Sequence, residues 1–174
     1  LRCLVGSEMC IRDSEYTVNF DANGGKGQME DQNFLYSIEQ ALSKNEFSKT
    51  GYSFTGWNTD KSGNGIAYAD EEKVLNLTAE NGGTVTLYAQ WAVNKYKVTF
   101  DANGGETVSE TKTLGYGSKY GNLPTTTREG YTFLGWFTAA EGGQQVGVDV
   151  KTVKIADDHV LYAHWKANTY MVFF

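Results

Sequence analysis

The segment YTVNFDANGG (Tyr16–Gly25) returns later in the chain as YKVTFDANGG (Tyr96–Gly105), and this pair of segments decides the fold. Within the first segment, Tyr16, Val18 and Phe20 alternate with polar residues, which predicts a strand with one buried face. The sequence Asp-Ala-Asn-Gly-Gly that follows contains the residue types that most readily adopt the positive φ angles of a tight turn. Each segment therefore predicts a strand that runs into a turn.

Two further motifs recur in the same order along the chain. GYSFTGW (Gly51–Trp57) returns as GYTFLGW (Gly130–Trp136), and LYAQW (Leu87–Trp91) returns as LYAHW (Leu161–Trp165). Ordered repetition of this kind indicates a tandem array of one structural unit. We therefore expect two copies of the same small module.

The positions of the motifs divide the chain into segments. We expect a first module over residues 15–93 and a second over residues 94–166, with Ala92–Lys95 as a short linker between the motifs. YMVFF at Tyr170–Phe174 aligns with the opening strand, so residues 167–174 are expected to begin a truncated third repeat. The chain is accordingly interpreted as a fragment of a longer array.

The segment before the first motif shares no pattern with the rest. The stretch LVGSEMCIRDS, residues 4–14, resembles the transposon adapter end used in sequencing-library preparation when it is back-translated. We interpret residues 1–14 as a disordered read-through artefact and exclude them from the fold. Both cysteines, Cys3 and Cys10, lie in this segment, so the modules are expected to contain neither disulfides nor cysteine metal sites.

Other local patterns predict further strands. The second strand of a hairpin is expected near Gln32–Tyr36 in the first copy and near Glu110–Leu114 in the second. A strand that begins at Tyr52 loses its alternation at Gly56, which predicts a β-bulge or a close backbone approach before Trp57.

Helix is expected to be scarce, because no candidate segment reaches about ten residues. Short helical turns are expected at Glu71–Leu75 and Val148–Val153, and one or two turns at Ser37–Ser43. The predicted fold class is mostly β, of the α+β type, with two tandem β-rich repeat domains and little helix.

The composition limits the range of functions. The formal net charge is −6, and an acidic surface repels the phosphate backbone of nucleic acids and anionic lipid headgroups. No apolar stretch approaches the ~20 residues that span a bilayer. We therefore expect neither nucleic-acid binding nor membrane insertion by this stretch of chain.

One loop has some features of a calcium site. Asn58, Asp60 and Ser62 place oxygens at alternate positions, and a glycine follows at the sixth position. The twelfth position of a calcium loop carries a bidentate acid, whereas here it is Ala69. The pattern therefore favours a turn, and no metal ligand is assigned.

The remaining candidates for chemistry are two histidines and two pairs of acids. His159 and His164 lie five residues apart on one predicted strand and would point to opposite faces. The pairs Glu71–Glu72 and Asp157–Asp158 do not recur in the other copy, so solvated surface is favoured over glycosidase chemistry. We assign no catalytic residue, no cofactor and no metal.

The four tryptophans allow two interpretations. Trp57, Trp91, Trp136 and Trp165 recur at equal positions on predicted strands, which favours a place in the core. Exposed aromatic rings can also stack on sugars, so glycan binding stays open as the alternative.

Taken together, the signature YxVxFDANGG, GYxFxGW and LYAxW resembles the Listeria-Bacteroides repeat, also called the internalin-type B repeat. The resemblance covers nearly all of residues 15–166 in two copies. It implies a small β-grasp-like module of the kind found in tandem in secreted and wall-attached bacterial proteins, without catalytic residues.

The predicted function is that of a non-catalytic repeat region in an extracellular protein of the bacterial cell surface or cell wall. Core and turn residues repeat whereas no polar constellation does, which favours a spacer that presents adhesive domains. The alternative is that the modules bind a host surface protein or glycan themselves, weakly and multivalently. The expected partners are adjacent repeat units and, in the alternative, the host molecule; no ligand-binding residue can be named.

Overall fold

The computed structural model describes residues 15–174, so the segment interpreted as an adapter artefact, residues 1–14, lies outside the described residues. Residues 15–174 form eleven strands and no helix. The chain divides into two units between Ala92 and Val93. We call residues 15–92 module 1 and residues 93–174 module 2.

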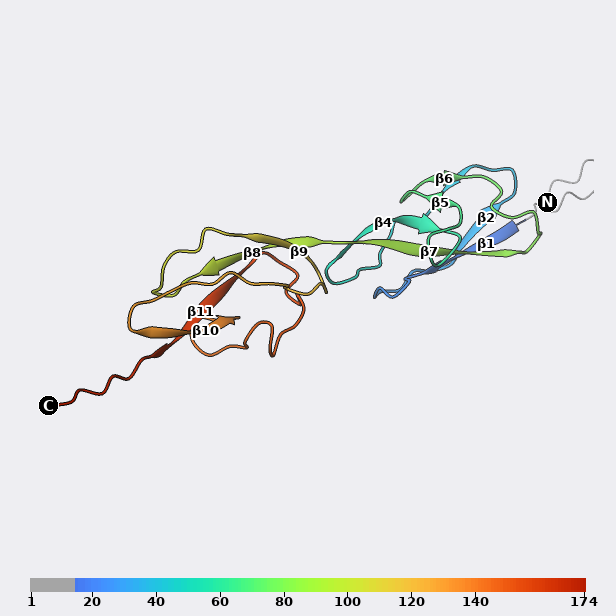
Figure 1. The fold of residues 1–174 in the computed structure, drawn as a ribbon. Helices are drawn as coiled ribbons and strands as arrows, with labels where there is room; N and C mark the ends of the chain where they lie inside the picture. Colours follow the sequence, from blue (N-terminus) through green and yellow to red (C-terminus); the bar gives the residue numbers. More distant parts are fainter. Residues whose placement is uncertain (1–14) are drawn as a thin grey trace, which may run out of the picture. The chain divides into compact units, whose positions relative to one another are not determined.

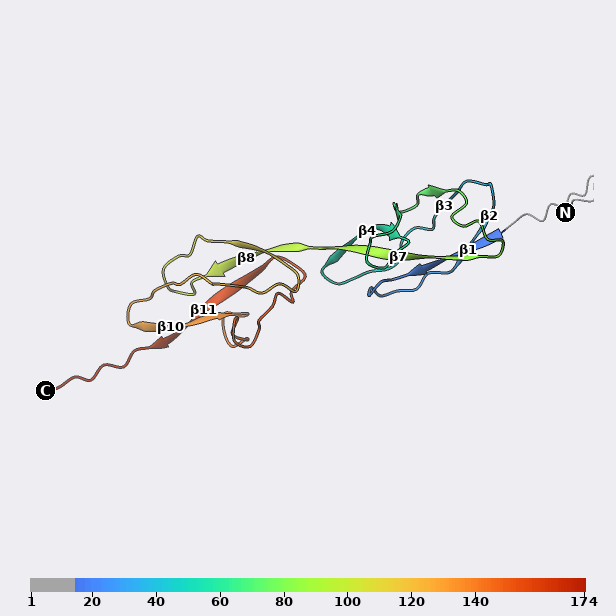
Figure 2. The same cartoon turned by 45° about the vertical axis from the view of Figure 1, so that its right-hand side comes forward.

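Module 1 is built on a mixed sheet in which the first and last long strands are parallel neighbours (Figures 1 and 2). Its strand order is β2-β1-β7-β4-β5, and Phe20 of the first strand lies opposite Leu87 of the last. Two short strands form a separate ladder. The strands are β1 (Glu15–Asp21), β2 (Gln32–Leu35), β3 (Gln40–Ala41), β4 (Tyr52–Asn58), β5 (Ala67–Tyr68), β6 (Lys73–Val74) and β7 (Thr84–Val93).

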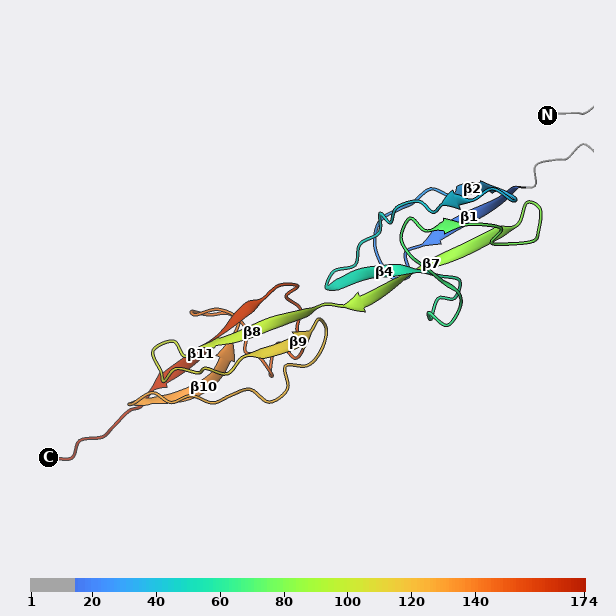
Figure 3. The same ribbon diagram turned by 90° about the horizontal axis from the view of Figure 1, so that it is seen from above.

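Module 2 repeats this arrangement with fewer strands. Its sheet has the order β10-β11-β8-β9, in which β8 and β11 form the central parallel pair (Figure 3). The strands are β8 (Lys95–Asp101), β9 (Lys112–Gly115), β10 (Tyr131–Phe137) and β11 (His159–Ala167). The mostly β fold predicted from the sequence is confirmed, and the shared strand order agrees with a β-grasp-like sheet.

The opening strand of each module forms as its alternation predicts. Tyr16, Val18 and Phe20 are all buried, whereas the residues between them are not. The hairpin partner of module 1 is β2, as predicted, and that of module 2 begins at Lys112, two residues later than expected. The turn after the opening strand has the predicted positive φ at Asn23 and at Asn103.

The three helical turns expected from the sequence were wrong. Ser37–Ser43 contains β3 and Glu71–Leu75 contains β6, and the two segments pair with each other. Val148–Val153 begins in a turn, in which the amide of Asp149 donates to the Gln145 carbonyl at 2.9 Å, and then makes single β-bridges from Val150 and Thr152. Segments this short cannot repay the cost of nucleating a helix, whereas pairing between segments satisfies their backbone groups.

The linker differs from expectation, whereas residues 167–174 as the start of a third repeat stay a prediction. Strand β7 ends at Val93 and β8 begins at Lys95, so of the predicted linker Ala92–Lys95 only Asn94 lies outside a strand. Tyr170–Phe174 forms no strand, and its side chains are exposed. The equivalent strand β8 pairs with β9 and β11, both of which follow it in sequence, and Tyr170–Phe174 pairs with no strand among residues 15–174.

Each module has an aromatic core around the tryptophan of its GW motif. Trp57 is fully buried, and its ring lies 4.8 Å from that of Phe20. Trp136 is equally buried, at the same 4.8 Å from Phe100. Large aromatic side chains bury much area per residue, which a module of this size needs for its stability.

The glycine before each of these tryptophans produces the break in alternation that the sequence predicts. The pairing of β10 with β11 shifts register between Phe133 and Gly135. In module 1, Gly56 has φ of 140°, and a Cβ on it would lie 2.6 Å from the carbonyl oxygen of Tyr68. The two glycines thus turn Trp57 and Trp136 into the core.

Candidate functional site

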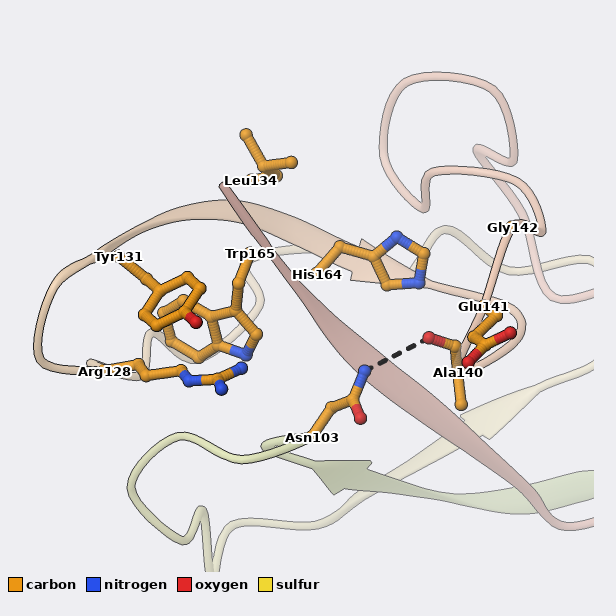
Figure 4. A pocket seen from close by; sticks show the side chains of 9 residues that line it. All are labelled: Asn103, Arg128, Tyr131, Leu134, Ala140, Glu141, Gly142, His164 and Trp165. Atoms are coloured by element: carbon orange, nitrogen blue, oxygen red, sulfur yellow. Dashed lines mark hydrogen bonds between the residues drawn. The ribbon is translucent and has the colours of Figure 1, made fainter. Parts of the chain in front are cut away.

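An open pocket of about 370 Å³ lies in module 2 where the DANGG turn, the GY motif and the last strand meet (Figure 4). Its volume falls in the range of about 300–1,000 Å³ that is typical of ligand pockets. The side chains that line it come from the repeated motifs and from one loop. They are Asn103, Arg128, Tyr131, Leu134, Ala140, Glu141, Gly142, His164 and Trp165.

Asn103 fixes the floor of the pocket. The turn brings its backbone amide to Asp101 Oδ1, which accepts a hydrogen bond at 2.8 Å. Its side-chain amide then donates to the carbonyl oxygen of Ala140 at 3.1 Å and to that of Ala163 at 3.0 Å. Because both N–H groups are used on carbonyls, the Oδ1 atom of Asn103 remains to face other partners.

Arg128, Tyr131 and Trp165 form one wall of the pocket, across from Glu141 (Figure 4). The guanidinium carbon of Arg128 lies 3.9 Å from the centre of the Tyr131 ring, which is close enough for a cation–π interaction. Trp165 lies beside them and donates from its indole nitrogen to the carbonyl oxygen of Ala102 at 2.9 Å.

Module 1 has the same cluster with a lysine in place of the arginine. Lys49 Nζ lies 4.8 Å from the Tyr52 ring centre and 5.9 Å from the Trp91 ring centre. Asn23 donates to the carbonyl oxygens of Lys61 and Ala89, as its counterpart does in module 2. The cluster therefore belongs to the repeat and not to one module.

Sequence reasoning missed the basic residue of this cluster, although a signal for it exists. Lys49 stands three residues before Tyr52, and Arg128 stands three residues before Tyr131. A positive charge at a fixed distance from a repeated aromatic residue is a pattern that could have pointed to a cation–π pair.

The four tryptophans fall into two classes. Trp57 and Trp136 are buried in the core, so their rings are closed to any ligand. Trp91 and Trp165 are half-buried and pack against the edge of the core, and Trp165 lines the pocket. The core interpretation holds fully for the first class and only in part for the second.

The two histidines do not converge. His159 makes a hydrogen bond of 3.1 Å through Nε2 with the hydroxyl of Tyr120. His164 lies in the pocket, where its ring stacks on Phe137 at a centre-to-centre distance of 3.9 Å. Its Nε2 lies 2.9 Å from the carbonyl oxygen of Ala139, which requires that this nitrogen carries the proton.

In the loop considered for calcium, the side-chain oxygens of Asn58 and Asp60 accept hydrogen bonds from groups of the same loop. Asn58 Oδ1 accepts from the amides of Asp60 and Gly65, at 2.8 and 3.0 Å. Asp60 accepts from the hydroxyl and the amide of Ser62, and these hydrogen bonds hold the pKa of its carboxyl below the usual value. The residues predicted to form a turn do so.

The paired acids are exposed and bond mainly to nearby backbone. Glu72 accepts from the amide of Ala69, and Asp158 accepts from that of Lys97 at 2.7 Å. No group of three or more histidines, cysteines or acids in residues 15–174 is placed to hold a metal ion. Within the same residues, no helix has the length and hydropathy needed to cross a membrane.

Comparison of the sequence with known protein families gives a match to both modules. The profile of the Listeria-Bacteroides repeat domain matches residues 16–90 and again residues 96–164. The chain belongs to the Listeria-Bacteroides repeat family. The resemblance drawn from the three motifs is thereby confirmed, and each module is one repeat of this family.

Three relatives carry similar sequence. The chain is 38% identical over 144 residues to a protein of Evansella cellulosilytica described as a Gly-rich membrane protein, covering 79% of this chain and 17% of the relative. A second protein of that organism, described as a membrane protein, is 37% identical over 160 residues, or 91% of this chain and 22% of the relative. Internalin H of Listeria monocytogenes is 37% identical over 122 residues, or 70% of this chain and 20% of the relative.

The matched region is a small part of each relative. The chain spans about a fifth of the length of the curated relatives it matches. The similarity thus concerns the Listeria-Bacteroides repeats, and the activities of the whole relatives are not carried over with it.

Proposed function

We propose that this chain is part of a non-catalytic repeat region of a bacterial cell-surface protein, where it acts as a spacer that presents adhesive domains. The family assignment and relatives described as membrane proteins and as an internalin support an extracellular place at the cell surface or wall. Adjacent repeats of the same chain are its immediate partners.

One observation carries the proposal. The residues that the two modules share are those that build the sheet, the core and the turns, such as Phe20 and Trp57 in module 1 and Phe100 and Trp136 in module 2. In the equivalent clusters the turn asparagine is shared, whereas Lys49 stands at the position of Arg128 and Gln90 at that of His164. A repeat maintained for its architecture needs this conserved interior and tolerates change at its surface.

A replacement experiment tests the spacer function. In the protein that carries these repeats, both modules are exchanged for two unrelated β-modules of similar length, and a second variant lacks them. A spacer predicts that adhesion of cells to a host-cell layer survives the exchange and falls on deletion. Loss of adhesion to the same extent in both variants would contradict a spacer and favour binding by the modules themselves.

The second function, direct binding of a host protein or glycan, is favoured by the pocket of module 2. It combines a cation, half-exposed aromatic rings and hydrogen-bond acceptors in one place. A weak site of this kind gains apparent affinity when several repeats act together.

A further inference from the structure

We propose that the pocket of module 2 binds a carboxylate-bearing sugar, with Arg128 as the group that recognises the carboxylate. The inference develops the second function above and names its ligand class. It does not depend on the spacer function, because a chain can both separate domains and hold a sugar weakly.

The state of Arg128 is the first step. Its guanidinium is held over Tyr131 at 3.9 Å, yet no hydrogen bond or ion pair within residues 15–174 uses its five N–H donors. A planar guanidinium presents two parallel donors to a carboxylate, which gives short and strong charge-assisted hydrogen bonds. Arg128 is therefore a cation that is positioned by an aromatic ring and still free to bind an anion.

The other end of the pocket supplies acceptors. Figure 4 shows Glu141 across the pocket from Arg128, with Asn103 between the two walls. Asn103 Oδ1 and the exposed carboxylate of Glu141 can accept hydrogen bonds from hydroxyl groups. A ligand that carries one carboxylate and several hydroxyls matches this distribution, whereas a polyanion meets repulsion from Glu141.

The apolar lining favours a ring over an extended acidic peptide. Tyr131 and Leu134 are 38% and 44% exposed, and Trp165 lies beside them half-buried. A pyranose presents a face of C–H groups that can cover such aromatic and aliphatic surface while its hydroxyls point to the sides.

Module 1 provides a matched comparison within the same chain. Lys49 takes the place of Arg128, and its ammonium already lies 3.4 Å from the carbonyl oxygen of Asn23. An ammonium lacks the planar pair of donors, and Gln90 replaces the imidazole of His164. We therefore assign the site to module 2 alone.

The test titrates the whole chain, with its tryptophans replaced by 5-fluorotryptophan, against four probes. These are methyl β-D-glucuronide, methyl β-D-glucoside, acetate and a tetraglutamate peptide. The ¹⁹F signal of Trp165 should shift saturably with the glucuronide, with a Kd on the order of millimolar as expected for a small open site. The glucoside and acetate should each bind about tenfold more weakly, because the glucoside lacks the carboxylate and acetate lacks the sugar ring.

Variants assign the effect to Arg128. Arg128→Ala should weaken glucuronide binding about tenfold or more, and Arg128→Lys several-fold. Lys49→Ala, the matched change in module 1, should leave binding unchanged. An unaltered ¹⁹F signal of Trp136 shows that module 2 is still folded in each variant.

Several results would overturn the proposal. They are the absence of a saturable Trp165 shift, equal binding of glucoside and glucuronide, acetate binding as tightly as the glucuronide, tighter binding of tetraglutamate, and an equal loss in Lys49→Ala. The titration reads one tryptophan signal whereas the replacement experiment reads adhesion, so either proposal can fail without the other.

Discussion

The tryptophan of the GW motif lies at the equivalent place in the core of module 1 and of module 2, but the hydrogen bonding of its indole N–H differs between the two modules. Trp57 and Trp136 each lie 4.8 Å from the phenylalanine of the opening strand. Trp136 donates to the carbonyl oxygen of Pro124 at 2.7 Å, whereas the buried indole nitrogen of Trp57 has no hydrogen-bond partner among residues 15–174. The difference teaches that the ring packing of a tryptophan and the hydrogen bonding of its indole N–H depend on different residues.

Residues outside the repeated motifs also differ around the two rings. In module 1, Phe47 packs edge-on against Trp57 at 6.0 Å. The equivalent position in module 2 is Thr126, whose hydroxyl donates to the carbonyl oxygen of Glu106 at 2.7 Å. Module 1 thus adds apolar contact where module 2 adds hydrogen bonds.

The largest expected effect comes from removing the shared ring. Trp57→Ala and Trp136→Ala should each cost about 3–5 kcal/mol. That cost is close to the whole stability of a module this small, about 3–5 kcal/mol, so each variant should unfold its own module. The ¹⁹F signals of Trp91 and Trp165 report the two modules separately. A folded Trp165 signal in Trp136→Ala would show that the core does not depend on this ring.

The next largest effect on stability is expected from adding a methyl group to the last glycine of each DANGG turn, which lies close to Trp91 in module 1 and to Trp165 in module 2. A Cβ on Gly25 would lie 2.8 Å from Trp91 Cζ2, and one on Gly105 would lie closer still to Trp165. Gly25→Ala and Gly105→Ala should therefore destabilise their modules by about 1–3 kcal/mol, with the greater loss in module 2. Urea unfolding followed by the same ¹⁹F signals measures both.

Gly115→Ala is the control for this pair. A Cβ there would lie 3.6 Å from the nearest atom, a Val93 side-chain carbon, which is ordinary contact. A Cβ on Gly105 would also lie 2.9 Å from the Thr127 carbonyl oxygen, so a loss at Gly115 as large as that at Gly105 would show that backbone freedom, and not these close contacts, causes the effect.

A smaller difference in stability is expected when each core tryptophan is replaced by phenylalanine, which removes its indole N–H. Trp57→Phe and Trp136→Phe remove similar volume, but only the second breaks a hydrogen bond and leaves the Pro124 carbonyl without its donor. Trp136→Phe should therefore cost about 1 kcal/mol more than Trp57→Phe. Equal losses in urea unfolding would mean that solvent satisfies the indole of Trp57 as well as Pro124 satisfies that of Trp136.

The smallest effect is a difference in alkaline stability. Burial raises the pKa of Tyr120 in module 2, where its hydroxyl meets His159. A folded-state pKa above the unfolded value stabilises the module fully below about pH 10 and less as pH rises through the folded pKa. Tyr120→Phe should therefore reduce the alkaline loss of module 2 in ¹⁹F-detected thermal unfolding between about pH 8 and pH 11.

Module 1 serves as the internal control for that titration. Its structurally equivalent residue, Leu42, does not titrate, and the alkaline loss caused by Tyr68 should persist in Tyr120→Phe because burial also raises the pKa of Tyr68. An unchanged alkaline slope in module 2 would show that Tyr120 does not contribute to it.

The short segments show where sequence-based expectations fail. Ser37–Ser43 and Glu71–Leu75 each contain too few residues for a period to be recognised, and both were expected to form helical turns. Their actual structure depends on pairing between Gln40 and Val74, which lie 34 residues apart (74 − 40). No local pattern records such a partner.

The sequence by itself determined the repeat, the opening strands, the DANGG turns and the family. These features depend on alternation, on turn chemistry and on the order of motifs, all of which are local and occur twice. It also placed Gly56 and Gly135 at the break in the strand, because a glycine out of phase with the alternation has a direct geometric consequence.

Only the tertiary structure decided which tryptophans are enclosed and what surrounds Arg128. Trp136 and Trp165 both belong to repeated strand motifs, yet Trp136 is buried against Phe100 and donates to the Pro124 carbonyl, whereas Trp165 is half-buried and lines a pocket. The pocket joins residues from Asn103 to Trp165, and contacts over such separations follow from the folded chain and not from any local pattern.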